Sequence, residues 1–541
     1  MGRFPCTLKL GPGWKKKDAK ELNFTWDPSQ ISNKNDVLLN VTLIGYKENK
    51  TSVIWQDIKT INSSVPNNGN FSFSPSDHRC EGDECDFEIG VIEARLKTKD
   101  HKQSSTYIAL NCGMIPLGWL MNHHQQQQQQ PWPDKKCNTW QAEDKKNTPW
   151  LEDLLPCPTT LDDAMSDFGR WQPDDACYKG SKSKTNCNLH TPAIHCARSF
   201  EPTKQGAGNQ CCYDSTGKLI KHRSTPDRSH DWGSTPYNEP LRVPSASHWL
   251  VDIIPIFYCC KWNTTGNCSR YLEQRPAKYK QYQPPKPGII SLQEDHLLKT
   301  FDDLEYTFQA KGDFWLFKSD RIKLQGRFDT EQKNIAMKEE GDVVEIRVAP
   351  SNLFSGNRLQ VLVNNVSKFF DHEPLRMQDF KDVSIITNEA KGNLGKHGNF
   401  TVIFKSGVGV VVAEDERRLY VKINLPPKYQ NKKDSGGLLG TWNDNKNDDL
   451  TIRGTNTAVK ETSEDDFKKF ALSWFVKENE RLFRQASTVD EPIILFQSAH
   501  AAHADITMLL LCLVLAVWMS SYSTQDEVGV KRLGCRSESW T

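Results

Sequence analysis

Several features are absent from this chain of 541 residues, and each absence argues against a class of protein. An excess of one charge is missing, because 69 lysine and arginine residues are balanced by 68 aspartate and glutamate residues. The net charge of +1 supplies no field that would attract nucleic acid. The sequence also has no Gly-x-Ser-x-Gly motif, no phosphate-binding loop and no His-Glu-x-x-His motif. It therefore gives no support to a nucleic-acid binder, a nucleotide-dependent enzyme or a metalloprotease.

Long apolar runs are scarce as well. The run from Ile506 to Met519 is the candidate membrane span, and it extends to residues 506–522 when two serines are included. Crossing a bilayer takes about 20 apolar residues, so this is at best a short transmembrane segment, followed by a polar tail over residues 523–541. Residues 1–6 contain no apolar leader, so we expect the start to be truncated and a signal sequence to lie upstream.

Cysteine is concentrated in one half of the chain. Fourteen of the 16 cysteines lie in the first 268 residues, and none occurs from residue 269 to residue 511. Ten fall within residues 137–270, which predicts a small module held together by disulfide bonds in an oxidising compartment. Cys187-x-x-His190 and His195-Cys196 have a spacing that zinc could use, but disulfide bonds are the favoured interpretation.

Nine Asn-x-Ser/Thr sequons agree with passage through the secretory pathway, where such sites accept glycans. Five lie in the first 72 residues, in strand-like sequence. The acceptor residues are Asn23, Asn40, Asn49, Asn62, Asn70, Asn263, Asn267, Asn365 and Asn399. The sequons and the cysteines together predict a protein of the cell surface or the extracellular space.

The alternation of apolar and polar residues divides the chain into structured parts, and the predicted fold class is mainly β and multidomain. Short alternating runs separated by Asn, Gly and Pro turns predict an immunoglobulin-like β-sandwich over residues 1–115. Alternating runs without cysteine predict an all-β domain over residues 290–480. Linkers are expected between these parts, over the glutamine-rich residues 116–136, the proline-rich residues 271–289 and residues 481–505.

The segment from Asn443 to Asp449 has amides at alternate positions 443, 445 and 447 and carboxylates at its end. Oxygen atoms at this spacing allow one loop to wrap Ca²⁺. The loop is not an EF-hand, because Asp448 stands at the sixth position, where that motif requires glycine. The alternative is a surface loop of Asx turns, in which each side chain bonds to the backbone two residues further on. These residues alone leave both interpretations open.

Two regions resemble a von Willebrand factor type D domain: residues 437–450 (GLLGTWNDNKNDDL) and residues 300–308 (TFDDLEYTF). In that family the Asp after Thr-Phe and the Asn/Asp loop converge on calcium. The resemblance therefore implies a structural Ca²⁺ site whose ligands are Asp302, Asn443, Asn445, Asn447 and Asp448. The family usually opens with Gly-Asp-Pro-His, a self-cleavage site, but residues 294–297 read EDHL here. Without an Asp-Pro bond we expect no self-cleavage at this position.

The cysteine-rich region resembles the AMOP domain of adhesion-associated proteins. The similar motifs are residues 155–158 (LPCP), residues 210–214 (QCCYD) and residues 252–255 (DIIP) ahead of Cys259-Cys260. The order of modules resembles that of septate-junction proteins, sushi-domain-containing membrane proteins and membrane mucins. It implies a non-enzymatic adhesion or junction protein, single-pass at the cell surface or secreted. Its expected partners are extracellular or cell-surface proteins, with homotypic contact included.

An enzymatic alternative rests on residues 433–437 (KDSGG), which resemble the nucleophile motif of trypsin-like proteases. A secreted hydrolase of this type would use Ser435 beside Asp434, with His296 or His372 as the base. A glycine-rich turn is the favoured interpretation, because no histidine precedes the serine in the sequence context that this family requires. A third alternative is a matrix or mucin-like component without an anchor, which differs only in the fate of residues 506–522.

Overall fold

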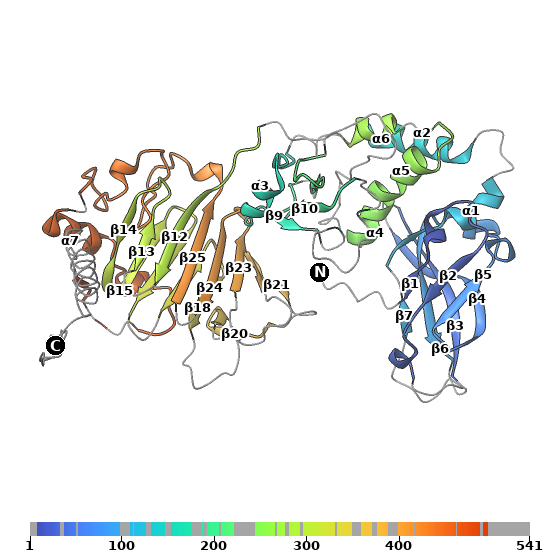
Figure 1. Cartoon of the computed structure of the whole chain (residues 1–541), viewed down its shortest axis with the longest axis horizontal. Helices are drawn as coiled ribbons and strands as arrows, with labels where there is room; N and C mark the ends of the chain where they lie inside the picture. Colours follow the sequence, from blue (N-terminus) through green and yellow to red (C-terminus); the bar gives the residue numbers. More distant parts are fainter. Residues whose placement is uncertain are drawn as a thin grey trace, which may run out of the picture.

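The computed structural model shows a mainly β, multidomain chain with antiparallel sheets and a disulfide-rich region (Figure 1). Figure 1 shows three bodies in a row: a first domain in blue, a disulfide-rich module in cyan and green, and a C-terminal β domain in yellow and orange. The structure describes residues 8–495 except 33–36, 50–51, 98–108, 112, 126–130, 147–152, 175–176, 178–186, 188–191, 205–206, 221–243, 266–267, 276–280, 293–295, 330–332, 349–358, 371–375, 388–398, 416–417, 461, 487–488 and 490.

The first domain, up to residue 117, contains two antiparallel sheets around one core. The smaller sheet has the order β1-β2-β5 and the larger the order β4-β3-β6-β7, with β8 paired to β6. Buried and exposed side chains alternate along β2. Leu22 and Phe24 point into the core, whereas Asn23 and Thr25 are exposed. The strand orders do not by themselves identify an immunoglobulin-like topology. The strands are β1 (Lys9–Leu10), β2 (Leu22–Thr25), β3 (Leu38–Glu48), β4 (Val53–Pro66), β5 (Asn70–Phe73), β6 (Ile89–Leu96), β7 (Ala109–Asn111) and β8 (Ile115–Pro116).

The disulfide-rich module, residues 132–275, has a helical part and a small β part. Its strands form one sheet in the order β11-β10-β9. The β part contains α3 (Leu161–Ser166), β9 (Trp171–Pro173), β10 (His195–Ser199) and β11 (Gln210–Tyr213). The helical part contains α2 (Trp132–Asp144), α4 (Pro244–His248), a π-helix (Trp249–Ile253), α5 (Ile254–Ile256), a second π-helix (Phe257–Lys261) and α6 (Ser269–Gln274).

All ten cysteines of this module are paired, which confirms the predicted disulfide framework. The bonds are Cys137–Cys259, Cys157–Cys211, Cys177–Cys187, Cys196–Cys212 and Cys260–Cys268. Cys187 and Cys196 are therefore not zinc ligands. A sixth bond joins Cys80 to Cys85 in the first domain, while Cys6 and Cys112 lie outside the described residues.

The linker expected over residues 116–136 is packed at its start, while glutamines 126–130 lie outside the described residues. Residues Gly118–Gln125 form α1, and Trp119, Leu120 and Met121 are buried, because this short apolar run covers the gap between the first domain and the module. Trp262 of the module also contacts the first domain, since its Nε1 donates to the carbonyl of Lys15 over 2.9 Å. Parts of the other expected linkers are also structured, at α6 and at β26 (Ile493–Leu495), which pairs with β15.

The C-terminal β domain, residues 286–495, consists of two antiparallel sheets that enclose one large apolar core. The first has the order β14-β13-β12-β25-β24-β23-β22-β21 and the second β20-β19-β18-β17-β16-β15-β26. Their bounds are β12 (Lys286–Leu292), β13 (Leu297–Lys299), β14 (Glu305–Thr307), β15 (Gln309–Lys318), β16 (Lys323–Phe328), β17 (Asn334–Lys338), β18 (Val343–Val348), β19 (Leu359–Val363), β20 (Val366–Lys368), β21 (Met377–Asp379), β22 (Val383–Thr387), β23 (Asn399–Phe404), β24 (Gly409–Asp415) and β25 (Arg418–Leu425).

The expectation that this domain is all-β was wrong in one place. Residues Glu464–Ser473 form the helix α7, whose Phe467, Phe470 and Ala471 are buried against the core. The spacing of three and four between apolar positions and three acidic residues in the first turn favour a helix here.

The β part of the module docks on the outer face of the eight-stranded sheet. Gly169 lies against Gly407 and Gly409, so closely that a Cβ atom on Gly409 would stand 2.7 Å from Phe168 and from the Cα of Gly169. On the neighbouring strand, Asn424 Nδ2 donates to the carbonyl of Ser166 over 2.6 Å. Because glycine has no side chain, the backbone of the module can contact the backbone of the sheet directly at these positions.

We expect Gly409→Leu to detach the module from the sheet. The backbone of Gly409 is in an ordinary strand, so leucine disturbs the contact with residues 168–169 rather than β24 itself. Small-angle X-ray scattering should show a larger radius of gyration for this variant than for the unaltered chain. Gly113→Val is the control, because nothing lies within 4 Å of a Cβ at that position. Identical scattering from Gly409→Leu and the unaltered chain would contradict a glycine-dependent contact.

Candidate functional site

The candidate site lies in the C-terminal β domain, where the turn between β13 and β14 meets the loop after β25. Phe301 holds the turn in place, since its ring is buried and its N–H donates to the carbonyl of Leu439 over 3.1 Å. Asp302 then reaches the loop: its Oδ2 accepts from the N–H groups of Asn443 and Asn445, at 2.9 and 3.1 Å. Hydrogen bonds therefore join Asp302 directly to two residues that follow it by 141 and 143 positions in the sequence.

Asp448 is the second carboxylate of the site. Its Oδ2 accepts from Asn443 Nδ2 and Asn445 Nδ2, at 2.9 and 3.0 Å. The amide oxygens of these two asparagines accept from backbone N–H groups two residues further on, at Asn445 and Asn447. The loop is thus built from Asx turns, which is the pattern of the alternative interpretation, and the predicted residues around Asp302 and Asp448 are nevertheless brought together.

Asn447 is the weakest member of the predicted ligand set. Its side chain is exposed, and its Nδ2 donates to Asn445 Oδ1 over 3.3 Å rather than to a carboxylate of the site. A residue outside that set, Asp449, is placed more centrally: it is 2% exposed, and its Oδ2 accepts from Thr300 Oγ1 over 2.6 Å. Gly440, with φ of 70°, makes room for this carboxylate, because a Cβ there would collide with Asp449 Oδ1.

Three carboxylates are crowded in this site. The pKa of Asp449 is raised to about 7, chiefly by burial and in part by the charges of Asp302 and Asp448, against the lowering effect of the Thr300 hydroxyl. Asp302, Asp448 and Asp449 each keep one buried carboxylate oxygen, Oδ1, that has no hydrogen-bond partner among the described residues. Buried oxygens without partners are costly unless a proton or a cation satisfies them.

The donor chemistry fits calcium, which takes six to eight oxygen ligands in irregular geometry. In the described part of the chain, no group of three or more His, Cys, Asp or Glu side chains is arranged to hold one metal ion. Calcium in this site would therefore depend on amide or main-chain oxygens beside the carboxylates. When bound, the ion would neutralise the negative charge that Asp302, Asp448 and Asp449 place together.

The described residues of the hydrolase alternative make other contacts. Ser435 Oγ donates to the carbonyl of Lys432 over 2.8 Å, and Asp434 has a φ of 59°, as expected for a tight turn. The ring of His296 packs against Phe328, with ring centroids 5.8 Å apart. His372 lies outside the described residues, as do residues 294–295 of the stretch for which no self-cleavage is expected.

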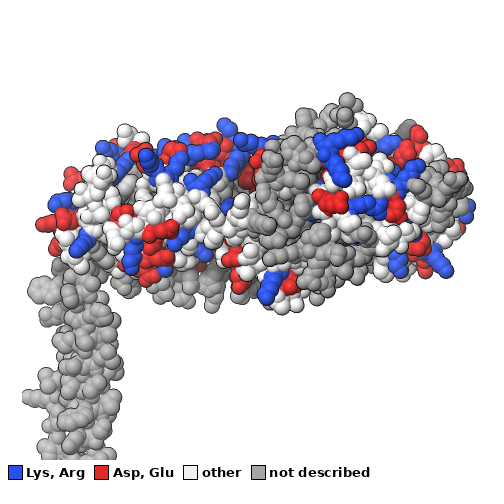
Figure 2. All heavy atoms as spheres, turned by 90° about the horizontal axis from the view of Figure 1, so that it is seen from above, with Lys and Arg blue, Asp and Glu red and all other residues white. Residues whose placement is uncertain are grey.

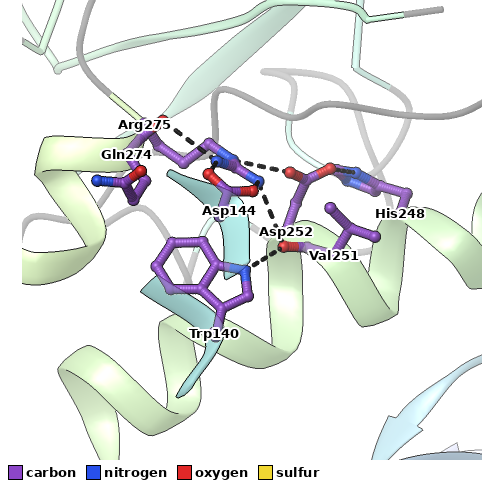
Figure 3. A network of polar contacts seen from close by, with 7 residues as sticks. All are labelled: Trp140, Asp144, His248, Val251, Asp252, Gln274 and Arg275. Atoms are coloured by element: carbon purple, nitrogen blue, oxygen red, sulfur yellow. Dashed lines mark hydrogen bonds and ion pairs between the residues drawn. The ribbon is translucent and has the colours of Figure 1, made fainter. Parts of the chain in front are cut away.

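A second polar cluster lies in the helical part of the disulfide-rich module (Figure 3). Arg275 is fully buried and pairs with two carboxylates: its Nε donates to Asp252 over 2.9 Å and its Nη1 and Nη2 to Asp144 over 2.6 and 2.9 Å. His248 Nδ1 lies 2.7 Å from the other oxygen of Asp252. Burial lowers the pKa of Arg275, but the two carboxylates more than offset this, so its pKa is raised overall. Complete enclosure of Arg275 and Asp252 indicates a structural clamp between helices rather than a reaction site.

Comparison with known proteins agrees with these features. The family model of the AMOP domain matches residues 132–283, and that of the von Willebrand factor type D domain matches residues 291–455. Protein mesh of Bombyx mori is 31% identical over 85% of this chain and 31% of its own length. Human Sushi domain-containing protein 2 is 28% identical over 88% of this chain and 58% of its own length. Human Mucin-4 is 24% identical over 63% of this chain and 6% of its own length.

This chain therefore spans less than two thirds of the length of the first two of these relatives. The AMOP match covers the disulfide-rich module with its five disulfide bonds, and the type D match covers the candidate site with Asp302 and residues 443–449. The chain is an AMOP and von Willebrand factor type D domain protein, related to protein mesh, Sushi domain-containing protein 2 and Mucin-4.

Proposed function

We propose that this chain is a non-enzymatic extracellular adhesion or junction protein. The observation that carries the proposal is the presence of an AMOP domain and a type D domain in one chain, aligned over most of its length with protein mesh and Sushi domain-containing protein 2. We further propose that the two sheets of the first domain form an immunoglobulin-like sandwich, a fold common in cell-surface proteins.

An extracellular location is supported by six disulfide bonds, because such bonds persist in oxidising compartments. Among the described residues no helix has the length and apolar character that a membrane crossing requires. Residues 506–522 lie outside that part of the chain, and we propose them as the attachment of a single-pass protein, with a secreted form as the alternative.

The partners that we propose are extracellular or cell-surface proteins, a second copy of this chain among them. On the face drawn in Figure 2, lysine and arginine alternate with aspartate and glutamate over the described residues, without a large area of one sign. A mixed surface of this kind matches protein partners better than a polyanion. In this proposal the type D domain binds a structural Ca²⁺ through Asp302, Asn443, Asn445, Asn447 and Asp448, with Asp449 added from the structure.

Adhesion can be measured with beads that carry the purified full-length chain. We expect these beads to bind cultured epithelial cells, or one another if contact is homotypic, and soluble chain to compete with the binding. Beads carrying chain with reduced and alkylated cysteines are the matched control, because they keep the composition and lose the module. If native beads bind no better than these control beads, to cells and to each other, the adhesion proposal is wrong.

A further inference from the structure

The structure separates the nine sequons into two groups. A glycan is bulky and hydrophilic, so an asparagine that carries one must point into solvent in the folded protein. The first group consists of five acceptor asparagines whose side chains are exposed: Asn23, Asn49, Asn62, Asn70 and Asn365. For these sites the fold has room for the sugar.

Three members of this group lie on open strand faces. Residues two apart on a strand share a face, so the hydroxyl residue that ends each sequon shows how open that face is. In all three sequons it is exposed as well. The pairs are Asn23 with Thr25 on β2, Asn70 with Ser72 on β5, and Asn62 with Ser64 on β4.

Asn365 lies at the tip of a hairpin. The two-residue turn between β19 and β20 consists of Asn364 and Asn365, with φ of 51° and 66°, as a type I′ turn requires. Asn364 turns toward the protein, because its Nδ2 donates to Asp342 and its Oδ1 accepts from the N–H of Val343. Asn365 is left exposed at the tip.

The second group has no such room. Asn40 on β3 and Asn399 on β23 are partly buried, and the Oδ1 atom of each is fully enclosed. The threonines that end their sequons, Thr42 and Thr401, are each 2% exposed, so other parts of the chain cover these faces. Asn263 belongs here too, because the nitrogen that would receive the sugar, Nδ2, donates to the carbonyl of Cys259. Asn267 lies outside the described residues.

We propose that the folded protein carries N-linked glycans on the first group and none on Asn40, Asn263 and Asn399. In the transfer, Nδ2 loses a proton and bonds to the anomeric carbon of the sugar, while the bond from that carbon to a lipid-linked diphosphate donor breaks and the lipid diphosphate leaves. Chains modified at an enclosed asparagine would be unable to close the surrounding strands and would be lost before secretion. The inference rests on the extracellular route of the proposed function.

Two of the proposed glycans are neighbours. The register of β2 and β5 places Asn23 opposite Ser72 and Asn70 opposite Thr25, so the two asparagines are diagonal neighbours on one face. Both line a shallow hollow of about 370 Å³ on this face. The outer face of the smaller sheet is therefore covered by carbohydrate and is not a protein-docking face.

The test is site-by-site occupancy in full-length chain secreted by its own cells. A glycan-releasing amidase in heavy-oxygen water converts each glycosylated asparagine to labelled aspartate, which peptide mass spectrometry counts. We expect label on most copies at the first group and roughly tenfold less at Asn40, Asn263 and Asn399, because the folded chain partly buries these three and holds Nδ2 of Asn263 in a hydrogen bond. Thr25→Ala should remove the label from Asn23 while leaving the asparagine in place and the other sites labelled.

Two results would count against the proposal, and they are distinguishable. Equal label in both groups would show that burial in this fold does not select the sites. Chain found only inside the cells, with no label at any of the nine sequons and with its ten module cysteines as free thiols, would instead show that the chain does not enter the secretory pathway and would overturn the proposed function.

Discussion

Saturating calcium is expected to raise the melting temperature of the C-terminal β domain within the full chain by roughly 5 to 10 °C. Free calcium at a hundred times the dissociation constant stabilises a folded state by about 2.7 kcal/mol. For a domain of about 200 residues, each kcal/mol corresponds to roughly 2 to 4 °C. The physical reason is that a cation satisfies the enclosed oxygens of Asp302, Asp448 and Asp449, which otherwise repel one another.

Asp302→Asn and Asp448→Asn are expected to abolish the calcium-dependent part of this shift. Both variants keep an oxygen that accepts the hydrogen bonds from Asn443 and Asn445, so the melting temperature in chelator should change less than with alanine. The matched control is Asp303→Asn, one residue away, whose carboxylate is exposed and pairs with Lys286 and Lys299. It should retain the full shift. Superimposable melting curves in excess calcium and in chelator for the unaltered chain would refute the calcium site.

Arg275→Met is expected to destabilise the AMOP domain by about 3 to 5 kcal/mol, because it leaves Asp252 buried without its cationic partner. Methionine fills much of the same volume, so the loss reports on charge more than on a cavity. Denaturant unfolding followed by tryptophan fluorescence measures it, since Trp140 packs beneath the guanidinium with its ring centre 5.2 Å away.

Arg270→Ala serves as the comparison for this prediction. Arg270 also pairs with an aspartate, Asp134, but both side chains are partly exposed, so about 0 to 1 kcal/mol should be lost. Adding Asp252→Leu to Arg275→Met should recover part of the stability by removing the unpaired charge. An effect of Arg275→Met no larger than that of Arg270→Ala would show that the buried cluster does not hold the helices together.

Much of the candidate site is visible in the sequence, because its loop is local. Asn443, Asn445 and Asp448 are close in the chain, and the Asx turns that join them need only a spacing of two or three residues. Asp302 could be added only through a family resemblance, since 141 residues separate it from the loop. The central position of Asp449 depends on its contact with Thr300, 149 residues away, which no local pattern encodes.

The fold shows the same division. Alternation located the strands and cysteine counts located the disulfide-rich module, but the start of the linker expected over residues 116–136 is packed. A low-complexity composition indicates an exposed linker, whereas Trp119 and Met121 just before the glutamines are buried between two domains. Helix α7 was missed because a ten-residue helix among strands is short, although its acidic first turn was a usable signal.

By itself, the sequence determined the mainly β class, the segregation of disulfide chemistry from a cysteine-free domain, the two domain families and the loop that carries the candidate site. These properties follow from composition and short-range spacing, which the chain carries in any conformation. Only the tertiary structure decided which cysteines pair, that Arg275 neutralises Asp252 and Asp144 inside the AMOP domain, and that glycines hold this domain against the type D sheet. Several of them, such as the Cys137–Cys259 bond and the pairing of Arg275 with Asp144, join residues more than a hundred positions apart, and only packing brings such residues together.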